Sequence, residues 1–274
     1  MFVETVKRKM ARGDGILYFL LGISLVNSAE RNFIRLQEAR SMPPFTGQDS
    51  ARIVGGTAAS VNQFPHQVAL LRRNSLFCGG SLISDKWVLS AAHCVYSGNQ
   101  VVEPSSITVL AGTIDLTQGG VRRNVQRITP HESYGNFRND IALLQLEQAY
   151  QLGGSIQTIS LHHSEVPAGS SITISGWGRL YANGPLPSVL QYNQVTAISN
   201  SQCVGQTGIT DGLICLKSPV DNGACNGDSG GPAVYNNQLV GVANFVINYC
   251  GSSAPDGYAK VSHFVKWIES KMNL

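Results

Sequence analysis

The stretch CNGDSGGP, from Cys225 to Pro232, places one serine between an acidic residue and a pair of glycines. On its own, such a serine is typical of a turn. Two earlier stretches carry side chains that are able to act with it: SAAHC, Ser90–Cys94, holds a histidine, and NDIALL, Asn139–Leu144, holds an aspartate. Taken singly, the histidine is typical of a buried structural residue and the aspartate of a turn or a cap. The three stretches therefore gain meaning only in combination and in their order.

Many short apolar or alternating runs, separated by turns, follow one another after residue 53. They include HQVALL, SITVLAG, IALLQL and LICL, and PAVYNNQLVGVANF predicts a hairpin that turns at Asn236-Asn237. Regular short strands favour a barrel or a sandwich over an α/β fold. One helix is expected, at the end of the chain, with Ser262 as its cap and apolar residues at helical spacing from Phe264 to Ile268.

In this combination and order, the histidine, the aspartate and the serine resemble the chymotrypsin-like serine peptidase family. The resemblance covers Ile53 to Leu274 and adds RIVGG at Arg52–Gly56, GWG at Gly176–Gly178, six cysteines and the terminal helix. It implies an all-β fold of two antiparallel six-stranded Greek-key barrels with a C-terminal α-helix. Within a peptidase domain of residues 53–274, the barrels are expected at about 53–161 and 162–274.

The resemblance also implies hydrolysis of peptide bonds through an acyl-enzyme. A serine hydroxyl is a poor nucleophile unless a base removes its proton, and imidazole suits that task near neutral pH. Ser229 is expected to attack the carbonyl, His93 to carry the proton, and Asp140 to fix the ring tautomer. The N–H groups of Gly227 and Ser229 are expected to form the oxyanion hole. The alternative is a catalytically silent homologue that acts as a binding module, although no triad residue is missing here.

Arg52 marks an expected activation site. In the family, cleavage after the equivalent basic residue frees an ammonium group that pairs with the aspartate before the catalytic serine, which here gives Ile53 with Asp228. Such a buried pair is worth several kcal/mol compared with either charge alone. The alternative is that Arg52 lies in a surface linker and is cut incidentally.

The pocket for the substrate side chain departs from the trypsin pattern. Its expected base is Gly223, where a trypsin carries Asp, so strict Arg/Lys specificity is not expected. Val246 replaces a glycine of the entrance, and Asn244 replaces a serine that normally supports the buried aspartate. Asp256 is expected to face the pocket from another wall, as in brachyurin-type enzymes, unless it only forms an Asp-Gly turn. We expect chymotrypsin- or elastase-like or mixed specificity.

The cysteines number six, an even count, and all follow residue 52. This favours disulfides over a zinc site, since no Cys-x2-Cys pair is present. The pairing that the resemblance implies is Cys78–Cys94, Cys203–Cys215 and Cys225–Cys250. No metal or cofactor is expected, and the loop around Asp115 has a single carboxylate where calcium-binding relatives have several oxygen ligands.

The N-terminal segment carries the apolar run GILYFLLGISLV, Gly15–Val26, after a basic cluster. Twelve residues match the core of a signal peptide at 1–29 better than a retained anchor, with Met1 or Met10 as initiator. Residues 30–52 are then the activation propeptide, ending in a linker without a periodic apolar pattern. A secreted, extracellular protein is expected.

Charge lies unevenly along the chain. Eight of the 20 Lys and Arg and five of the 17 Asp and Glu fall in residues 1–52, so the remainder carries no net charge. This argues against nucleic acid and against stable membrane association. The expected partners are protein or peptide substrates, an activating protease and protein inhibitors, and the enzyme is expected to be a monomer.

Overall fold

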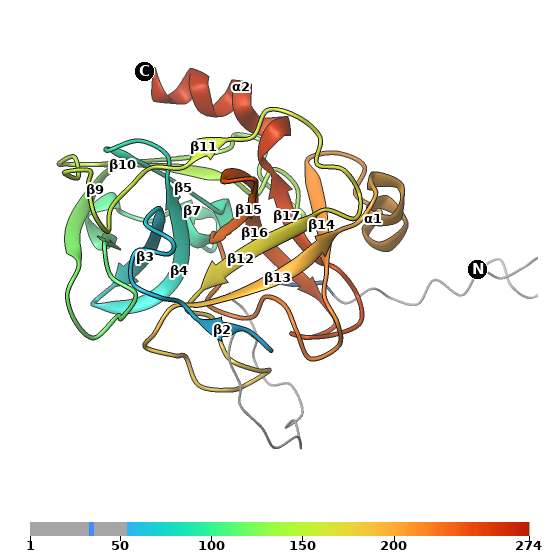
Figure 1. Cartoon of the computed structure of the whole chain (residues 1–274). Coiled ribbons are helices and arrows are strands. Elements are labelled where there is room, and N and C mark those ends of the chain that lie inside the picture. Colours follow the sequence, from blue (N-terminus) through green and yellow to red (C-terminus); the bar gives the residue numbers. More distant parts are fainter. Residues whose placement is uncertain (1–32, 36–53, 274) are drawn as a thin grey trace, which may run out of the picture. The chain divides into compact units, whose positions relative to one another are not determined.

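The computed structural model describes residues 33–35 and 54–273, which belong to one compact unit (Figure 1). The predicted signal peptide, most of the predicted propeptide and the Arg52–Ile53 bond lie outside the described residues. No helix in the described part of the chain has the length and apolar character needed to cross a membrane.

Six strands form the first closed barrel, in the order β10-β5-β4-β3-β8-β9. All its pairings are antiparallel. Its strands are β3 (Gln67–Arg72), β4 (Ser75–Leu82), β5 (Trp87–Ser90), β8 (Thr108–Ala111), β9 (Val121–Pro130) and β10 (Ala142–Leu146).

A second ring of six strands closes because β16 pairs with both β15 and β17. These strands are β12 (Ser171–Gly176), β13 (Gln191–Ala197), β14 (Leu213–Lys217), β15 (Pro232–Tyr235), β16 (Gln238–Ile247) and β17 (Asp256–Lys260). The two-barrel, all-β prediction is confirmed. The predicted hairpin is present between β15 and β16, where Asn236 and Asn237 take φ of 47° and 58°, as a type I′ turn requires.

The remaining strands join or extend the barrels. β2 (Thr57–Ala58) pairs with β13, and β11 (Ser160–Leu161) pairs in parallel with β16, so both ends of the first half of the chain attach to the second barrel. β6 (Tyr96–Ser97) and β7 (Gln100–Val101) pair with each other. β1 (Phe33–Arg35) pairs with β16, a strand that the sequence analysis did not predict.

Two α-helices occur among the described residues. The C-terminal α2 (Val261–Met272) is confirmed, but its cap is Lys260 and Ser262 lies inside the helix, so the predicted cap is wrong. α1 (Asn200–Thr207) was missed, although Ser199 and Gln202 form a capping box at its start. Short 3₁₀ helices span Ala92–Val95 and Pro104–Ser106.

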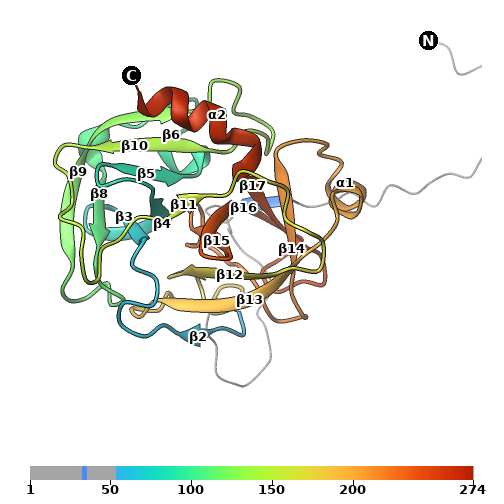
Figure 2. The same ribbon diagram turned by 45° about the horizontal axis from the view of Figure 1, so that its top comes forward.

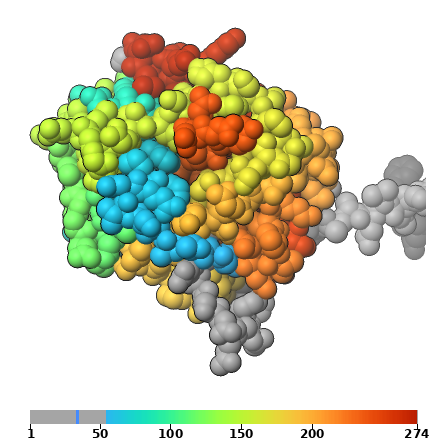
Figure 3. All heavy atoms as spheres, viewed as in Figure 1, coloured from blue at the N-terminus to red at the C-terminus, as the bar shows by residue number. Residues whose placement is uncertain are grey.

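Each barrel encloses its own apolar core. Leu70, Leu89 and Leu143 represent the first core, and Ile172 and Val240 the second. Helix α2 packs Phe264 and Ile268 against the first core and lies beside β10 in both ribbon views (Figures 1 and 2). In the space-filling view, blue and green residues of the first barrel lie directly against yellow and orange residues of the second (Figure 3).

Candidate active site

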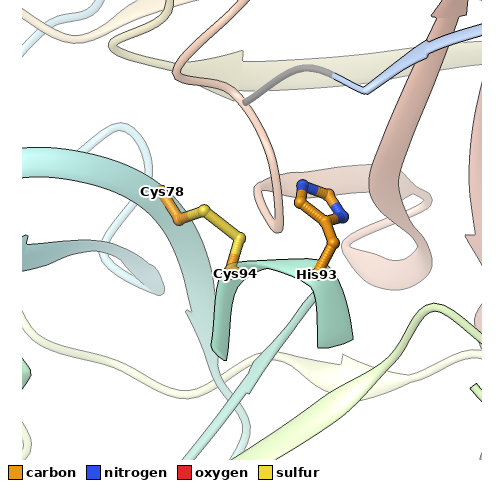
Figure 4. A group of neighbouring side chains, drawn as sticks. All are labelled: Cys78, His93 and Cys94. Atoms are coloured by element: carbon orange, nitrogen blue, oxygen red, sulfur yellow. A yellow bond between two sulfur atoms is a disulfide. The ribbon is translucent and has the colours of Figure 1, made fainter. Parts of the chain in front are cut away.

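His93 lies in the 3₁₀ turn that follows strand β5. The Cys78–Cys94 disulfide ties this turn to β4 (Figure 4). Because the two sulfurs are bonded to each other, they leave no thiolate that would make this histidine part of a metal site. The His93 ring is instead held by two other side chains.

Asp140 lies two residues before β10, and Ala142 of β10 pairs with Ser90 of β5. This register brings the segment before β10 next to the segment after β5, so Asp140 meets His93. Asp140 Oδ1 accepts a hydrogen bond from His93 N at 2.8 Å, and Asp140 Oδ2 lies 2.6 Å from His93 Nδ1. Since an ionised carboxylate only accepts, Nδ1 carries the proton and Nε2 is left as an acceptor.

Ser229 lies in a turn just before β15, with its Oγ 2.7 Å from His93 Nε2. Both barrels hold this turn, because Gly79 N of β4 donates to Ser229 O at 2.7 Å and Gly230 N donates to Ala243 O of β16 at 2.8 Å. Gly230 has φ of +76°, and a Cβ there would lie 2.6 Å from Gly79 O. Only glycine fits this crossing point.

The three side chains are almost wholly shielded from solvent: His93 is 3% exposed, Asp140 1% and Ser229 0%. A shielded series of hydrogen bonds from carboxylate to imidazole to hydroxyl is the arrangement that general-base activation of a serine requires. Next to it, Gly227 has φ of +103°, and neither its N–H nor that of Ser229 has an acceptor among the described residues.

Comparison with known proteins identifies the group to which this chain belongs. The family described as Trypsin matches residues 53–268. Serine protease SP24D of Anopheles gambiae is 58% identical over 244 residues, covering 89% of each chain. Brachyurin of Leptuca pugilator is 37% identical over 231 residues, covering 81% of this chain and 99% of its own. The structure of neuropsin, a serine protease expressed in the limbic system of mouse brain, matches with a TM-score of 0.72 at 30% identity, covering 79% of this chain and 98% of its own.

The chain belongs to the trypsin family. It is a chymotrypsin-like serine endopeptidase with protein substrates. Its structure contains the disulfides Cys78–Cys94, Cys203–Cys215 and Cys225–Cys250, the pairing that the resemblance implies.

Asp228, beside the serine, is a buried carboxylate. Gly178 N donates to its Oδ1 at 2.8 Å, and Cys225 N donates to its Oδ2 at 2.9 Å. A side chain at Gly178 would overlap this carboxylate, which explains why the second glycine of the GWG motif is a glycine. No described residue forms an ion pair with Asp228. Burial raises the pKa of Asp228 to about 6, although both N–H donors lower it.

Asp256 lies against the predicted base of the specificity pocket. It begins strand β17, so the turn alternative is wrong, and its Oδ2 accepts a hydrogen bond from Ala224 N at 3.0 Å. A Cβ on Gly223 would lie 2.7 Å from that oxygen and 3.0 Å from Ser218 Oγ. Burial, with a further contribution from the Asp228 charge, raises the pKa of Asp256 to about 8.

Val246 packs in the apolar cluster that also holds Ala243, Tyr258 and Ala224, the chain neighbour of Gly223. Asn244 is wholly buried, but its Nδ2 donates to Phe137 O at 3.0 Å, and its Oδ1 has no partner among the described residues. Its amide thus holds the loop before Asp140 and not the carboxylate itself. The sequence did not predict a role for Phe137 or Ser218, because neither lies in a motif.

Proposed function

We propose that this chain is the precursor of a secreted serine endopeptidase that is activated by cleavage after Arg52 and uses Ser229 as its nucleophile. The observation that carries the proposal is the continuous hydrogen-bonded series Asp140–His93–Ser229. The shielding of all three residues strengthens it, since hydrogen bonds and charges act more strongly where water is excluded.

In the proposed mechanism, Asp140 orients His93 through two contacts, one on the ring and one on the backbone N–H. His93 Nε2 takes the proton of Ser229 Oγ as the oxygen attacks the peptide carbonyl, and the imidazolium forms beside the Asp140 carboxylate. His93 then returns the proton to the leaving amine. Water repeats the sequence on the acyl-enzyme and releases the second product.

The oxyanion that forms during attack needs donors that have no other partner. The N–H groups of Gly227 and Ser229 meet this condition among the described residues. The positive φ of Gly227 turns its peptide in a way that a residue with a Cβ rarely adopts. We assign these two groups to the oxyanion hole.

Activation is proposed to supply the cation that Asp228 lacks among the described residues. Val54, the residue after the expected new N-terminus, packs against the Cys225–Cys250 disulfide, and its carbonyl accepts a hydrogen bond from Gly223 N at 3.0 Å. Cys225 is three residues from Asp228 and donates to it. The residue after the proposed ammonium group is therefore packed against the segment that binds Asp228, and pairing with that ammonium group would compensate a buried carboxylate that is costly to leave charged and alone.

Specificity is proposed to be mixed, with medium apolar side chains preferred and basic ones tolerated. At the base of the pocket Gly223 leaves its side-chain space to the Asp256 carboxyl group, and Val246 in place of glycine narrows the pocket entrance. Asp256 offers a carboxylate from the side, but its raised pKa keeps it mostly neutral at pH 7. The proposal further includes a monomeric enzyme, an activating protease that cuts after a basic residue, and regulation by protein inhibitors.

The test is reaction with a peptidyl phosphonate that labels active-site serines, combined with hydrolysis of a fluorogenic peptide after cleavage at Arg52. Ser229→Ala should lose all labelling, and the rate should fall by about 10⁵- to 10⁶-fold. The matched control is Ser164→Ala, an exposed serine, which should behave as wild type. If the cut wild-type chain were neither labelled nor active, the silent binding module would be the better description.

A further inference from the structure

Strand β1 occupies a free edge beside the active site. Residues Phe245–Ile247 of β16 extend beyond its pairing with β15, which ends at Val242. β1 pairs antiparallel with this extension, with Phe33 opposite Ile247, Ile34 opposite Val246 and Arg35 opposite Phe245. Three residues of the predicted propeptide thus add a strand to the second barrel, and Figure 2 shows β1 in blue at this side of it.

The edge that β1 occupies connects the nucleophile with the specificity pocket. Ala243 of β16 exchanges hydrogen bonds with the serine loop, from Gly230 N to its carbonyl at 2.8 Å and from its N–H to Gly231 O at 2.9 Å. Phe245 pairs with Gly257, the neighbour of Asp256. Extended peptides commonly bind by adding a strand to such an edge.

The direction of β1 is the one that a substrate needs. Because the pairing is antiparallel, the chain runs from Phe33 opposite Ile247 towards Arg35 opposite Phe245, and so towards Ala243 and the Ser229 loop. The acyl half of a substrate must likewise lead, N to C, to the carbonyl that Ser229 attacks.

Side chains of β1 are bound as well as its backbone. The ring of Phe33 lies 5.1 Å from that of Phe245 at 84° and 5.5 Å from that of Phe137. Phe137 and Phe245 are themselves 5.4 Å apart, so the three rings form one aromatic cluster. Such edge-to-face contacts add to the free energy of apolar burial. Ile34 packs against the cluster that contains Val246.

Phe137 is held in place to receive this ring. It has φ of 62°, an uncommon value for a bulky residue, and its carbonyl accepts the hydrogen bond of Asn244 Nδ2. Asn244, the residue just before the part of β16 that pairs with β1, thus supports the loop that carries Phe137.

We propose that Phe33–Arg35 is a pseudosubstrate: it binds the edge of β16 that peptide substrates use, and it inhibits the peptidase both before and after the chain is cut. The proposal rests on the proposed function, since it requires that substrates bind at this edge. It makes the propeptide an inhibitor in its own right, in addition to its role in withholding the Ile53 ammonium group.

The test uses a synthetic peptide of residues 31–40 with the cut, purified enzyme and a fluorogenic substrate. We expect competitive inhibition, in which the apparent KM rises and kcat stays constant. The Phe33→Ala peptide should inhibit about tenfold more weakly, because the aromatic contacts are lost. A scrambled peptide of the same composition is the control and should not inhibit. No inhibition at millimolar peptide, or equal inhibition by the Phe33→Ala peptide, would overturn the proposal.

A binding measurement separates this inference from the proposed function. Fluorescently labelled peptide is titrated into the cut Ser229→Ala enzyme, so neither hydrolysis nor activity enters the result. Phe137→Ala should lower the affinity of the enzyme for the wild-type peptide. It should lower the affinity for the Phe33→Ala peptide much less, because the two rings act as a pair. Independent, additive losses would contradict the aromatic cluster as the binding site. If the cut wild-type enzyme had no peptidase activity but Phe33 and Phe137 were still coupled in peptide binding, only the proposed function would be refuted.

Discussion

Replacing Asp228 by Asn should change stability differently in the uncut and in the cut chain. In the uncut chain, burial raises the pKa of this carboxyl group to about 6 from an ordinary 3.8. A carboxyl group whose pKa is higher in the folded state stabilises the fold while it is protonated. That contribution is present below about pH 4 and is lost as the pH rises through about 6. A difference of about two units corresponds to about 3 kcal/mol.

Asparagine removes this titration but keeps the shape. The NH₂ of the asparagine side chain then faces one of the two N–H groups, of Gly178 or Cys225, that donated to the carboxylate. Two donors that face each other cost about 1–3 kcal/mol at every pH. The informative quantity is therefore the pH dependence. We expect the free energy of unfolding of an Arg52→Gln precursor, measured in urea with disulfides intact, to fall by about 2.5 kcal/mol more between pH 4 and pH 7.5 than in the same precursor with Asp228→Asn, because at pH 4 the unfolded carboxyl group is already partly ionised.

The cut chain should be destabilised more strongly than the uncut chain at neutral pH. There the substitution leaves the Ile53 ammonium group buried without a partner, which should cost about 3–5 kcal/mol. Asp85→Asn, on an exposed residue, is the control in both forms. Equal pH slopes for the precursor with and without Asp228→Asn would show that Asp228 already has a partner before cleavage, and the account of activation would be wrong.

Further predictions concern the pocket, the serine loop and the new N-terminus. Because the pKa of Asp256 is raised to about 8, cleavage after basic residues should increase relative to cleavage after apolar ones between pH 6.5 and 9, and Asp256→Asn should abolish that increase. Gly230→Ala should destabilise the fold by about 2 kcal/mol or more and lower the rate by about 100-fold, whereas Gly205→Ala, with open space in α1, should be neutral or stabilising in thermal unfolding. Pairing with a carboxylate raises the pKa of the Ile53 ammonium group above its usual 7.7–8.0, so activity should persist below that folded pKa and be lost as the pH rises through it in rate measurements.

Much of the fold could be predicted because its signals are local. Alternating apolar runs with turns between them are sufficient for an all-β protein, and Asn236-Asn237 marks a hairpin because both residues adopt positive φ readily. Helix α1 was missed because it is short and weakly amphipathic, and only the capping box of Ser199 and Gln202 indicates it. At α2 the error is small, since a helix without a side-chain cap gives the sequence no mark of its first residue.

The site was predictable where its residues lie in motifs and not where it depends on long-range pairing. His93, Asp140 and Ser229 stand in recognisable stretches, and the register of β5 with β10 then brings the first two together. The contact between Asp256 and Gly223 needed the family pattern as well. Phe33 and Phe137 each lie in a stretch without periodicity, and their partner Phe245 is far along the chain. No local signal predicts that the three rings meet.

Cleavage after Arg52 ends both effects that keep the uncut chain inactive: the missing Ile53 ammonium group and the bound pseudosubstrate Phe33–Arg35. While the chain is intact, 18 residues join Arg35 to Val54, and a tether of this length holds the pseudosubstrate at an effective concentration of about a millimolar. Cleavage after Arg52 frees the Ile53 amine and turns the inhibitor into a separate peptide, because residues 1–52 contain no cysteine to retain it. With an inhibition constant between micromolar and millimolar, the tethered segment occupies the site before the cut. The free peptide dissociates from the enzyme once the cut sample is diluted. The activity per molecule of a freshly cut, unseparated sample should therefore rise on dilution, and a Phe33→Ala chain should show constant activity per molecule under the same treatment.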